Sequence, residues 1–176
     1  MDLFEAISKR HSYRLGFKDT PIPEADLRKI VQAGLDAPSG KNAQTTTFVI
    51  VNDPEVVSRI RTLKSGRKAM EQAAAYIACC LDSEPEAIYH GDHFQIEDSA
   101  TAVENMLLAI TALGYATVWI DGWLRLSNHA DQVGKIIGLP ANKVVRIILP
   151  LGIPAEEVTP PEKRAFEERV YFNRYG

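Results

Sequence analysis

The sequence has little cysteine, no surplus of positive charge and no long apolar run, and each shortage excludes a class of protein. Its 176 residues carry a formal net charge of −3, whereas a general nucleic-acid binder normally has a basic surplus. No apolar run reaches the roughly 18–20 residues that span a bilayer, and the richest stretch, 100–113, is interrupted by Glu104 and Asn105. We therefore expect neither nucleic acid nor a membrane as a partner.

The two cysteines, Cys79 and Cys80, are adjacent in the sequence, and no cysteine or histidine stands at metal-finger spacing around them. We expect two buried thiols within a strand, because free cysteine is among the most buried residue types. His90-Gly91-Asp92-His93 could suggest a metal pair, but it has no obvious further ligands, and we predict no metal site. Without a secretory signal at the N-terminus, a reducing cytoplasm is the expected compartment.

The common catalytic signatures are also missing: the sequence contains no GxGxxG, no GxxxxGK[ST], no GxSxG and no HExxH. What is present is ordinary globular composition, with 45% apolar and 24% charged residues. A chain of this length and composition predicts a single domain, residues 1–176. Hydrophobic periodicity and turn residues then predict its elements.

The predicted elements alternate between helices and strands, which favours an α/β or α+β sandwich. Helices are expected near 3–10, 23–36, 55–63, 95–113 and 128–137, and strands at 47–51, 76–81, 116–120 and 144–149. The helix near 95–113 is apolar almost all round, so it should be buried on most sides, and we expect a subunit interface to help cover it. An acidic, exposed insertion is expected at 82–91, and an extended arm at about 155–176, where Pro160-Pro161 and many charges stand.

A basic cluster follows the first predicted helix: Arg10, His11, Ser12 and Arg14. In extended backbone, alternate residues point the same way, and guanidinium groups with a hydroxyl suit a phosphate. By itself the cluster is also typical of a solvated helix end, which the helix dipole favours.

A polar loop, 38–44, offers the short hydrogen-bonding side chains of Ser39, Asn42 and Gln44, while Gly40 allows a ligand to approach the backbone. The end of the third predicted strand, Asp121-Gly122, could present backbone groups to a ligand. Taken alone, each of these two segments could also be an ordinary loop that binds no ligand.

The order of these segments resembles the nitroreductase family. Arg10-His11-Ser12-Tyr13-Arg14 resembles its R-x-S-x-R opening, and Ala37 to Gln44 its A-P-S-G-x-N-x-Q loop. Asp98 at the start of the long helix, then Gly114 and Trp119-Ile120-Asp121-Gly122, resembles its L-G-x-x-x-x-W-x-x-G passage. Gly152-x-Pro154 and Lys163-Arg164 resemble its C-terminal segment.

The resemblance implies an α+β fold: a three-layer sandwich with a central, mostly antiparallel sheet, helices on both faces, and a C-terminal arm exchanged in a homodimer with FMN at the interface. It implies an FMN-dependent oxidoreductase that takes hydride from NAD(P)H and reduces a small organic acceptor, nitroaromatic or quinone-like, by a ping-pong mechanism. No catalytic side chain is implied. The implied cofactor residues are Arg10, His11, Ser12, Arg14, Ser39, Asn42, Gln44, Asp121, Gly122, Lys163 and Arg164.

Three alternatives stand beside this hypothesis. The chain could bind FMN as a sensor or carrier without turnover, or it could be a reductive dehalogenase on the same scaffold. The basic cluster could also hold a phosphate ligand that is not a flavin. Position 121 is an aspartate, whereas the family often has a small residue there. This difference could change the redox potential of the flavin or its contact with the backbone.

Overall fold

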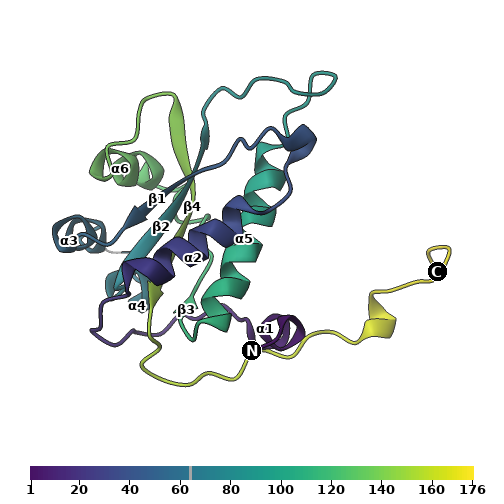
Figure 1. The fold of residues 1–176 in the computed structure, drawn as a ribbon, viewed down its shortest axis with the longest axis horizontal. Helices are drawn as coiled ribbons and strands as arrows, with labels where there is room; N and C mark the ends of the chain where they lie inside the picture. The colour runs from purple at the N-terminus through teal and green to yellow at the C-terminus, as the bar shows by residue number, and fades with distance from the viewer. Residues whose placement is uncertain (64) are drawn as a thin grey trace.

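The computed structural model, which describes residues 1–63 and 65–176, is an α+β sandwich of three layers (Figure 1). The strands of its central sheet are β1 (Thr47–Val51), β2 (Ala75–Asp82), β3 (Ala116–Thr117) and β4 (Lys143–Gly152), in the order β1-β2-β4-β3. Each pair of neighbouring strands in this sheet is antiparallel. The expected architecture, helices on both faces of an antiparallel sheet, is confirmed.

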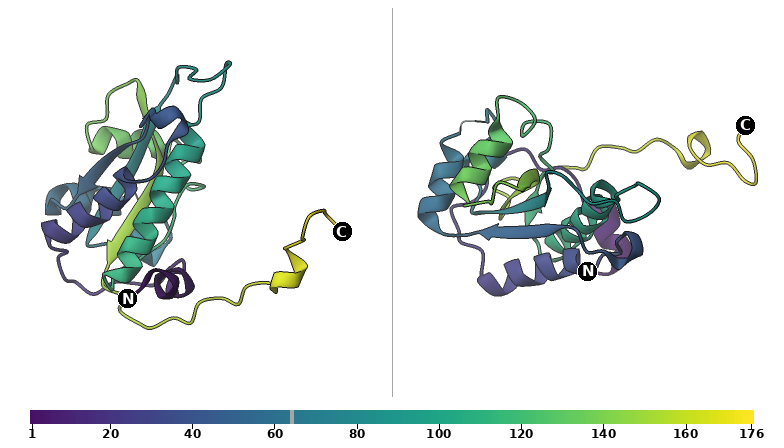
Figure 2. Two further views of the ribbon diagram at one scale, coloured as in Figure 1. Left: turned by 45° about the vertical axis from the view of Figure 1, so that its right-hand side comes forward. Right: turned by 90° about the horizontal axis from the view of Figure 1, so that it is seen from above.

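The helices divide between the two faces of the sheet, as the views in Figures 1 and 2 show. The helices are α1 (Leu3–Lys9), α2 (Glu24–Leu35), α3 (Pro54–Arg61), α4 (Lys68–Glu71), α5 (Gln95–Ala112) and α6 (His129–Ile136). One face packs against α2 and α5, and the other against α3, α4 and α6. All but α4 were expected from the sequence, and α4 was missed because one turn is too short to show a period.

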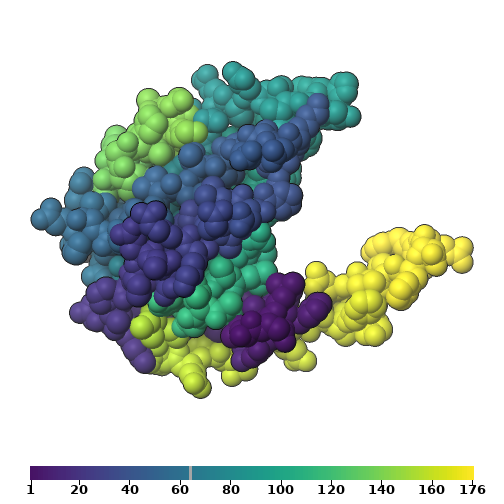
Figure 3. All heavy atoms as spheres, in the orientation of Figure 1, coloured from purple at the N-terminus to yellow at the C-terminus, as the bar shows by residue number. Residues whose placement is uncertain are grey.

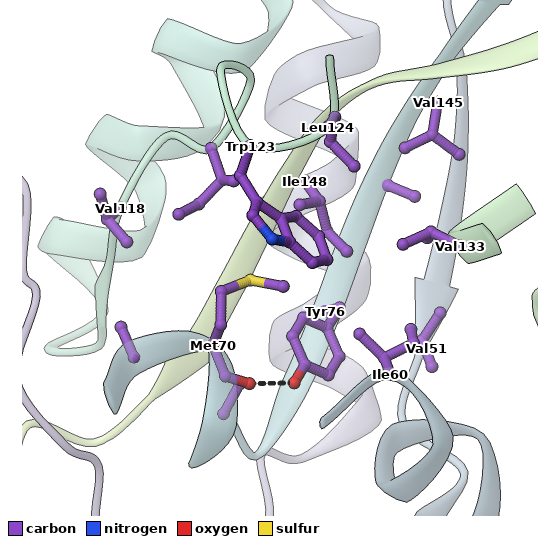
Figure 4. Packing of buried hydrophobic residues seen from close by; sticks show 14 of the residues in the cluster. Val51, Ile60, Met70, Tyr76, Val118, Trp123, Leu124, Val133, Val145 and Ile148 are labelled. Atoms are coloured by element: carbon purple, nitrogen blue, oxygen red, sulfur yellow. Dashed lines mark hydrogen bonds between the residues drawn. The ribbon is translucent and has the colours of Figure 1, made fainter. Parts of the chain in front are cut away.

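Two hydrophobic cores form because successive side chains of a strand point to opposite faces. Cys79 packs in the core with α2 and α5, whereas Cys80 packs in the core with α3, α4 and α6. Figure 4 shows the second core, in which Trp123 and Tyr76 fill the centre and the Tyr76 hydroxyl donates to the Met70 carbonyl. The expectation of two buried thiols in a strand is confirmed, and both are free.

The third strand is shorter than the predicted 116–120, because its continuous pairing with β4 covers only Ala116 and Thr117 and returns as a single bridge between Ile120 and Ile148. In the antiparallel register the next partner, opposite Val118, is Pro150, which has no N–H to donate. The N–H of Ile148, two residues earlier, donates to the Ile120 carbonyl at 2.9 Å, so the nitrogen of Pro150 faces the same edge. Pro150 therefore interrupts the ladder on the β3 side, while β4 itself continues to Gly152, beyond the predicted end.

Asn128, the first residue of the predicted helix 128–137, stands at the N-cap position of α6 with a left-handed backbone (φ 57°), but its side chain makes no capping hydrogen bond within the described residues. The chain enters α6 from a tight turn, where the His129 ring stacks on Trp123 with ring centroids 4.1 Å apart. Contacts of His129 and Ala130 with the preceding turn, 123–126, accompany the start of this helix in place of a side-chain cap.

The C-terminal arm, which we define as residues 155–176, is exposed along its whole length and extends away from the body (Figures 1 and 3). The large apolar side chains of α1 are exposed too, with Phe4 at 80% of its full accessible surface. None of the helices in the part of the chain that the structure describes is long and apolar enough to cross a membrane. Within the same residues, no three His, Cys, Asp or Glu side chains gather as metal ligands would.

Gly152 lies where Phe17 crosses β4, and a side chain there would collide with the ring. A Cβ at Gly152 would lie 2.4 Å from Cγ of Phe17. We predict that Gly152→Ala lowers the free energy of unfolding by about 1–3 kcal/mol, because the ring must shift. The matched control is Gly134→Ala in α6, whose Cβ would meet Leu139 at an ordinary 3.6 Å and should stabilise the helix by about 0.5–1 kcal/mol. Urea unfolding measures both, and equal effects would contradict the prediction.

Burial makes the two thiols a source of alkaline instability. Desolvation raises the pKa of Cys80 to about 11, and it also raises the pKa of Cys79, whereas an exposed thiol has a pKa of about 8.5. The contribution of each buried thiol to the free energy of unfolding is fully present below the thiol pKa of the unfolded protein. It is lost as pH rises toward the higher thiol pKa of the folded protein. We predict that Cys80→Ala, though less stable at pH 7.5, loses roughly 1–2 kcal/mol less than the wild type between pH 7.5 and 10. Parallel losses in urea unfolding would disprove this.

Candidate functional site

The basic segment 10–14 is held in place by Tyr13, which is 1% exposed. The Tyr13 N–H donates to the carbonyl of Thr117 in β3 at 2.8 Å. Its ring packs against Phe17 with centroids 5.3 Å apart, and its hydroxyl donates to the Gly16 carbonyl at 2.8 Å. With Tyr13 turned inward, its neighbours Ser12 and Arg14 point outward, which is the alternation expected of extended chain.

The same hydroxyl fixes the start of the arm. Tyr13 Oη accepts from the backbone N–H of Ala155 at 3.1 Å and from that of Glu156 at 3.3 Å. Phe17 also forms a β-bridge with Pro154. The first residues of the arm are thereby bound to the segment that carries the basic cluster, although 142 positions separate Tyr13 from Ala155 in the sequence.

The predicted basic residues surround one cavity of about 540 Å³, which we call the arginine cavity. It is lined by Ile7, Ser8, Arg10, His11, Ser12, Arg14, Glu104, Pro160, Pro161 and Lys163. Three cationic side chains and a hydroxyl thus converge on one space, as a phosphate requires. The structure brings together five of the eleven predicted cofactor residues here.

His11 adds a polar atom that has no partner. Its Nδ1 lies 2.9 Å from the Lys9 carbonyl, and a carbonyl only accepts, so Nδ1 carries the proton of that bond. Its Nε2 is buried without a hydrogen-bond partner among the residues that the structure describes. A buried polar atom left unpaired is costly, and the His11 residue itself lines the arginine cavity. Two guanidinium groups, an ammonium group and a hydroxyl around one cavity fit a phosphate-containing ligand.

A second cavity, of about 200 Å³, adjoins the first at Arg14, and we call it the Gly122 cavity. It is lined by Arg14, Arg67, Ala69, Val118, Trp119, Ile120, Asp121, Gly122 and Trp123. Gly122 is exposed, and a Cβ there would meet no atom within 4 Å among the described residues. The backbone at Gly122 is open to a ligand that also reaches Arg14.

The Asp121 carboxylate accepts hydrogen bonds from two arginines. Arg125 donates to both of its oxygens, at 2.8 and 3.0 Å, and Arg146 donates to Oδ2 at 3.1 Å. Arg146 reaches Asp121 because β4 has a bulge opposite Cys79 and Cys80, and a bulge re-aims the extra residue. The negative charge of Asp121 is thus balanced within the protein, and its backbone is left to face the Gly122 cavity.

The predicted loop 38–44 is fixed by Asp98, a 6% exposed residue near the start of α5. Asp98 accepts from the Gly40 N–H at 2.8 Å and from the Thr45 hydroxyl at 3.0 Å. Lys41, Asn42 and Gln44 all have positive φ, between 50° and 56°, a conformation that costs energy outside glycine. Gly40 is needed for Phe94, whose ring would lie 2.5 Å from a Cβ, so the close approach expected from a ligand is made here by a side chain.

The remaining predicted residues lie elsewhere in the single chain. Ser39 lines a small cavity of about 110 Å³ beside Asp98, and Gln44 lines both this one and a broad cavity of about 850 Å³ next to the acidic insertion. Asn42 is exposed, and the Arg164 guanidinium pairs with Glu168 at 3.0 Å. The structure does not bring Ser39, Asn42, Gln44 or Arg164 to the arginine cavity.

Helix α5 explains this separation. Asp98 holds the polar loop, whereas Glu104, six residues further on, pairs with Arg10 at 3.4 Å. Six residues correspond to a rise of about 9 Å and a turn of roughly 120° around the helix. The loop and the arginine cavity therefore lie on different faces of α5.

Five residues at or near this site were not assigned their roles from the sequence, and one of them is Glu104, which lines the arginine cavity. Tyr13 and Asp98 stand inside the recognised segments, but their roles as anchors depend on distant partners. Arg67 was missed altogether. Arg146 could have been noticed, because it is the one charged residue in the apolar stretch 144–151.

Comparisons with known proteins agree on one family. The sequence pattern of the nitroreductase family matches residues 7–86 and 61–153. The chain is 31% identical over 169 residues to an NADPH-flavin oxidoreductase of Vibrio harveyi, covering 90% of this chain and 69% of that one. It is 28% identical over 197 aligned residues to an NADH dehydrogenase of Thermus thermophilus, covering 97% and 95%. An FMN-dependent nitroreductase of Clostridium difficile has the same fold, with a TM-score of 0.80 and 25% identity, over 98% of this chain and 99% of that one.

Asp98 should be a larger source of stability than its position on a helix end suggests. We predict that Asp98→Ala lowers the free energy of unfolding by about 1.5–3 kcal/mol, because the Gly40 N–H and the Thr45 hydroxyl lose a charged acceptor. Asp98→Asn should cost less, since its carbonyl can still accept from Gly40. As the control, Glu97→Ala at the exposed neighbouring position should lower the free energy of unfolding by less than about 1 kcal/mol. Urea unfolding and hydrogen exchange of the Gly40 amide test this; equal effects at Asp98 and Glu97 would refute it.

Proposed function

The chain belongs to the nitroreductase family, and on that premise we propose that it is an FMN-dependent oxidoreductase. Its proposed reaction takes hydride from NAD(P)H and reduces a small organic acceptor, nitroaromatic or quinone-like, by a ping-pong mechanism. When bound, FMN would supply the redox chemistry, receiving a hydride and delivering electrons. The protein would supply binding, orientation and charge.

The observation that carries this proposal is the arginine cavity. Arg10, Arg14 and Lys163 place positive charge around it. Ser12 adds a hydroxyl group, and His11 is a further lining residue. A phosphate monoester carries about −1.5 to −2 charges at pH 7 and offers three acceptor oxygens. The residues present therefore fit the phosphate end of FMN.

The flavin ring would lie toward the Gly122 cavity, which shares Arg14 with the arginine cavity. Gly122 leaves room for a flat ring against the backbone, and Arg14 and Arg67 offer positive charge beside it. Positive charge and N–H donors near a reduced flavin favour its anionic form. Because Arg125 and Arg146 neutralise the Asp121 side chain, the departure from a small residue there adds little free negative charge.

We further propose that the site is completed in a homodimer. The loop with Ser39, Asn42 and Gln44 lies on a different face of α5 from the arginine cavity, so a second copy could bring its loop to the first copy's flavin. Exposed apolar side chains on α1 and on the arm support such a partner, since monomers rarely expose apolar surface of this extent. These side chains are Leu3, Phe4, Ile7, Phe166, Tyr171, Phe172 and Tyr175. The arm, extended away from its own body (Figure 2), would wrap the partner.

The free thiols Cys79 and Cys80 support a reducing compartment, and we propose the cytoplasm.

The decisive experiment is the absorption spectrum of the purified protein, followed by NAD(P)H oxidation with a nitroaromatic or quinone acceptor. We expect a flavin spectrum that bleaches anaerobically with NADH or NADPH and returns on adding the acceptor. A loaded protein that neither nicotinamide reduces would instead be a sensor or carrier. A protein that takes up no FMN would leave a phosphate site without flavin and would overturn the proposal.

Arg14 is the residue that both cavities share. We predict that Arg14→Ala weakens FMN binding by about 1.5–3 kcal/mol, because a charge-assisted hydrogen bond to the ligand is lost. Arg28→Ala removes an equally long cation from an exposed ion pair with Glu24 on α2 and should leave FMN affinity unchanged. Flavin fluorescence during titration with FMN measures the dissociation constant of each variant. Unchanged affinity in Arg14→Ala would remove Arg14 from the site.

Removal of residues 163–176 tests the role of the arm. If the arm wraps a second copy and Lys163 closes the arginine cavity, the truncated protein should lose dimer stability and FMN retention together. Analytical ultracentrifugation and flavin content after gel filtration measure the two effects. A truncated protein that stays dimeric and fully loaded would contradict the arm assignment.

A further inference from the structure

Glu104 is the one charged residue in the stretch 99–112 of α5, which is otherwise apolar or neutral. Its side chain is exposed, whereas the residues on either side in α5, Val103 and Asn105, are buried and half-buried. The side chain of its neighbour Asn105 donates to the Ala33 carbonyl at 3.0 Å and joins α5 to α2. Glu104 has a different neighbour, because it lines the arginine cavity.

The partner of Glu104 is Arg10. Oε1 of Glu104 lies 3.4 Å from Nε of Arg10, with side-chain exposures of 51% and 23%. This distance is longer than that of a strong charge-assisted hydrogen bond, so the pair attracts chiefly through its charges. The carboxylate therefore competes for a cation that the proposed phosphate site also uses.

The charges around the arginine cavity can be compared with those of the proposed ligand. Arg10, Arg14 and Lys163 contribute three positive charges, and Glu104 contributes one negative charge, which leaves a net of two. A phosphate monoester carries about −1.5 to −2 charges at pH 7. With Glu104 present, one phosphate group balances the cavity; without it, the cavity would keep an excess of positive charge.

We propose that Glu104 sets the affinity of the phosphate site by lowering its net positive charge. Its carboxylate pairs with Arg10 in the ligand-free protein and repels the phosphate when FMN is bound, and both effects weaken the hold on the phosphate group. The identity of the ligand rests on the proposed function, whereas the effect of Glu104 rests on the charges of the cavity. The site is thus matched to a single phosphate monoester, held less tightly than three unopposed cations would hold it.

The test uses the full-length protein loaded with FMN or with riboflavin, which lacks the phosphate. Dilution releases the flavin, and the rise in free-flavin fluorescence gives each dissociation constant. Glu104→Gln should lower the FMN dissociation constant about two- to fivefold, the size expected for a partly exposed ion pair. The riboflavin constant should not change, and the gain for FMN should shrink as salt is added.

Two variants serve as controls. Glu104→Asp keeps the charge and should bind FMN as the wild type does. If the length of the side chain mattered instead of its charge, this variant would bind FMN with a different affinity. Glu97→Gln removes the same charge from an exposed position of the same helix and should change neither constant. FMN affinity that is unchanged or lower in Glu104→Gln, or equal tightening of FMN and riboflavin, would overturn the proposal.

Inorganic phosphate separates this inference from the proposed function. If the wild-type protein binds no flavin, the proposed function fails. The effect of Glu104 can then still be measured, as the rise in Tm of each protein when phosphate replaces chloride at equal ionic strength. A larger rise in Glu104→Gln than in the wild type and Glu97→Gln would support the role of Glu104. Equal rises in the three proteins would overturn it.

Discussion

Tyr13 joins three parts of the molecule that the sequence keeps far apart: its own segment, β3 and the start of the arm. Its hydroxyl makes two of these links. It donates to Gly16 within its own segment and accepts from the backbone of Ala155 and Glu156, while the Tyr13 N–H reaches Thr117. A buried hydroxyl must find partners, and these partners fix the basic segment against the sheet and the arm against the basic segment. Without this anchor, the cations of the arginine cavity would sit on a free helix end, where the side-chain entropy lost on binding a phosphate is larger.

Helix α5 connects this anchor with the rest of the site. Its apolar side chains bury it against the sheet and α2, so its few polar groups are held at fixed positions. Asp98 holds the polar loop, Asn105 holds α2, and Glu104 faces Arg10. Since these positions differ in direction around the helix, one element supports two binding surfaces that do not meet in one chain. This separation is the physical argument for a second copy.

The sheet contributes through two irregular features. Pro150 interrupts the pairing of β3 with β4 after Thr117, apart from the single bridge between Ile120 and Ile148, and the chain from Val118 to Trp123 lines the Gly122 cavity. The bulge in β4 turns Arg146 toward Asp121 and balances a carboxylate that would otherwise disfavour a reduced, anionic flavin. Both features lie in the strands next to the proposed ring position, as bulges near functional sites often do.

The sequence alone determined the elements that depend on local patterns. The period of apolar residues predicted α1, α2, α3 and α5, and alternation or β-branched residues predicted β1, β2 and β4. The order of four short segments was enough to identify the family, because four loose motifs rarely occur together in the same order by chance. The tertiary structure decided which side chains meet: Tyr13 with Ala155, Asp98 with Gly40, Arg146 with Asp121. These contacts join residues 25 to 142 positions apart, and no local pattern encodes them, because they follow from how helices pack on a sheet and from where a strand is interrupted.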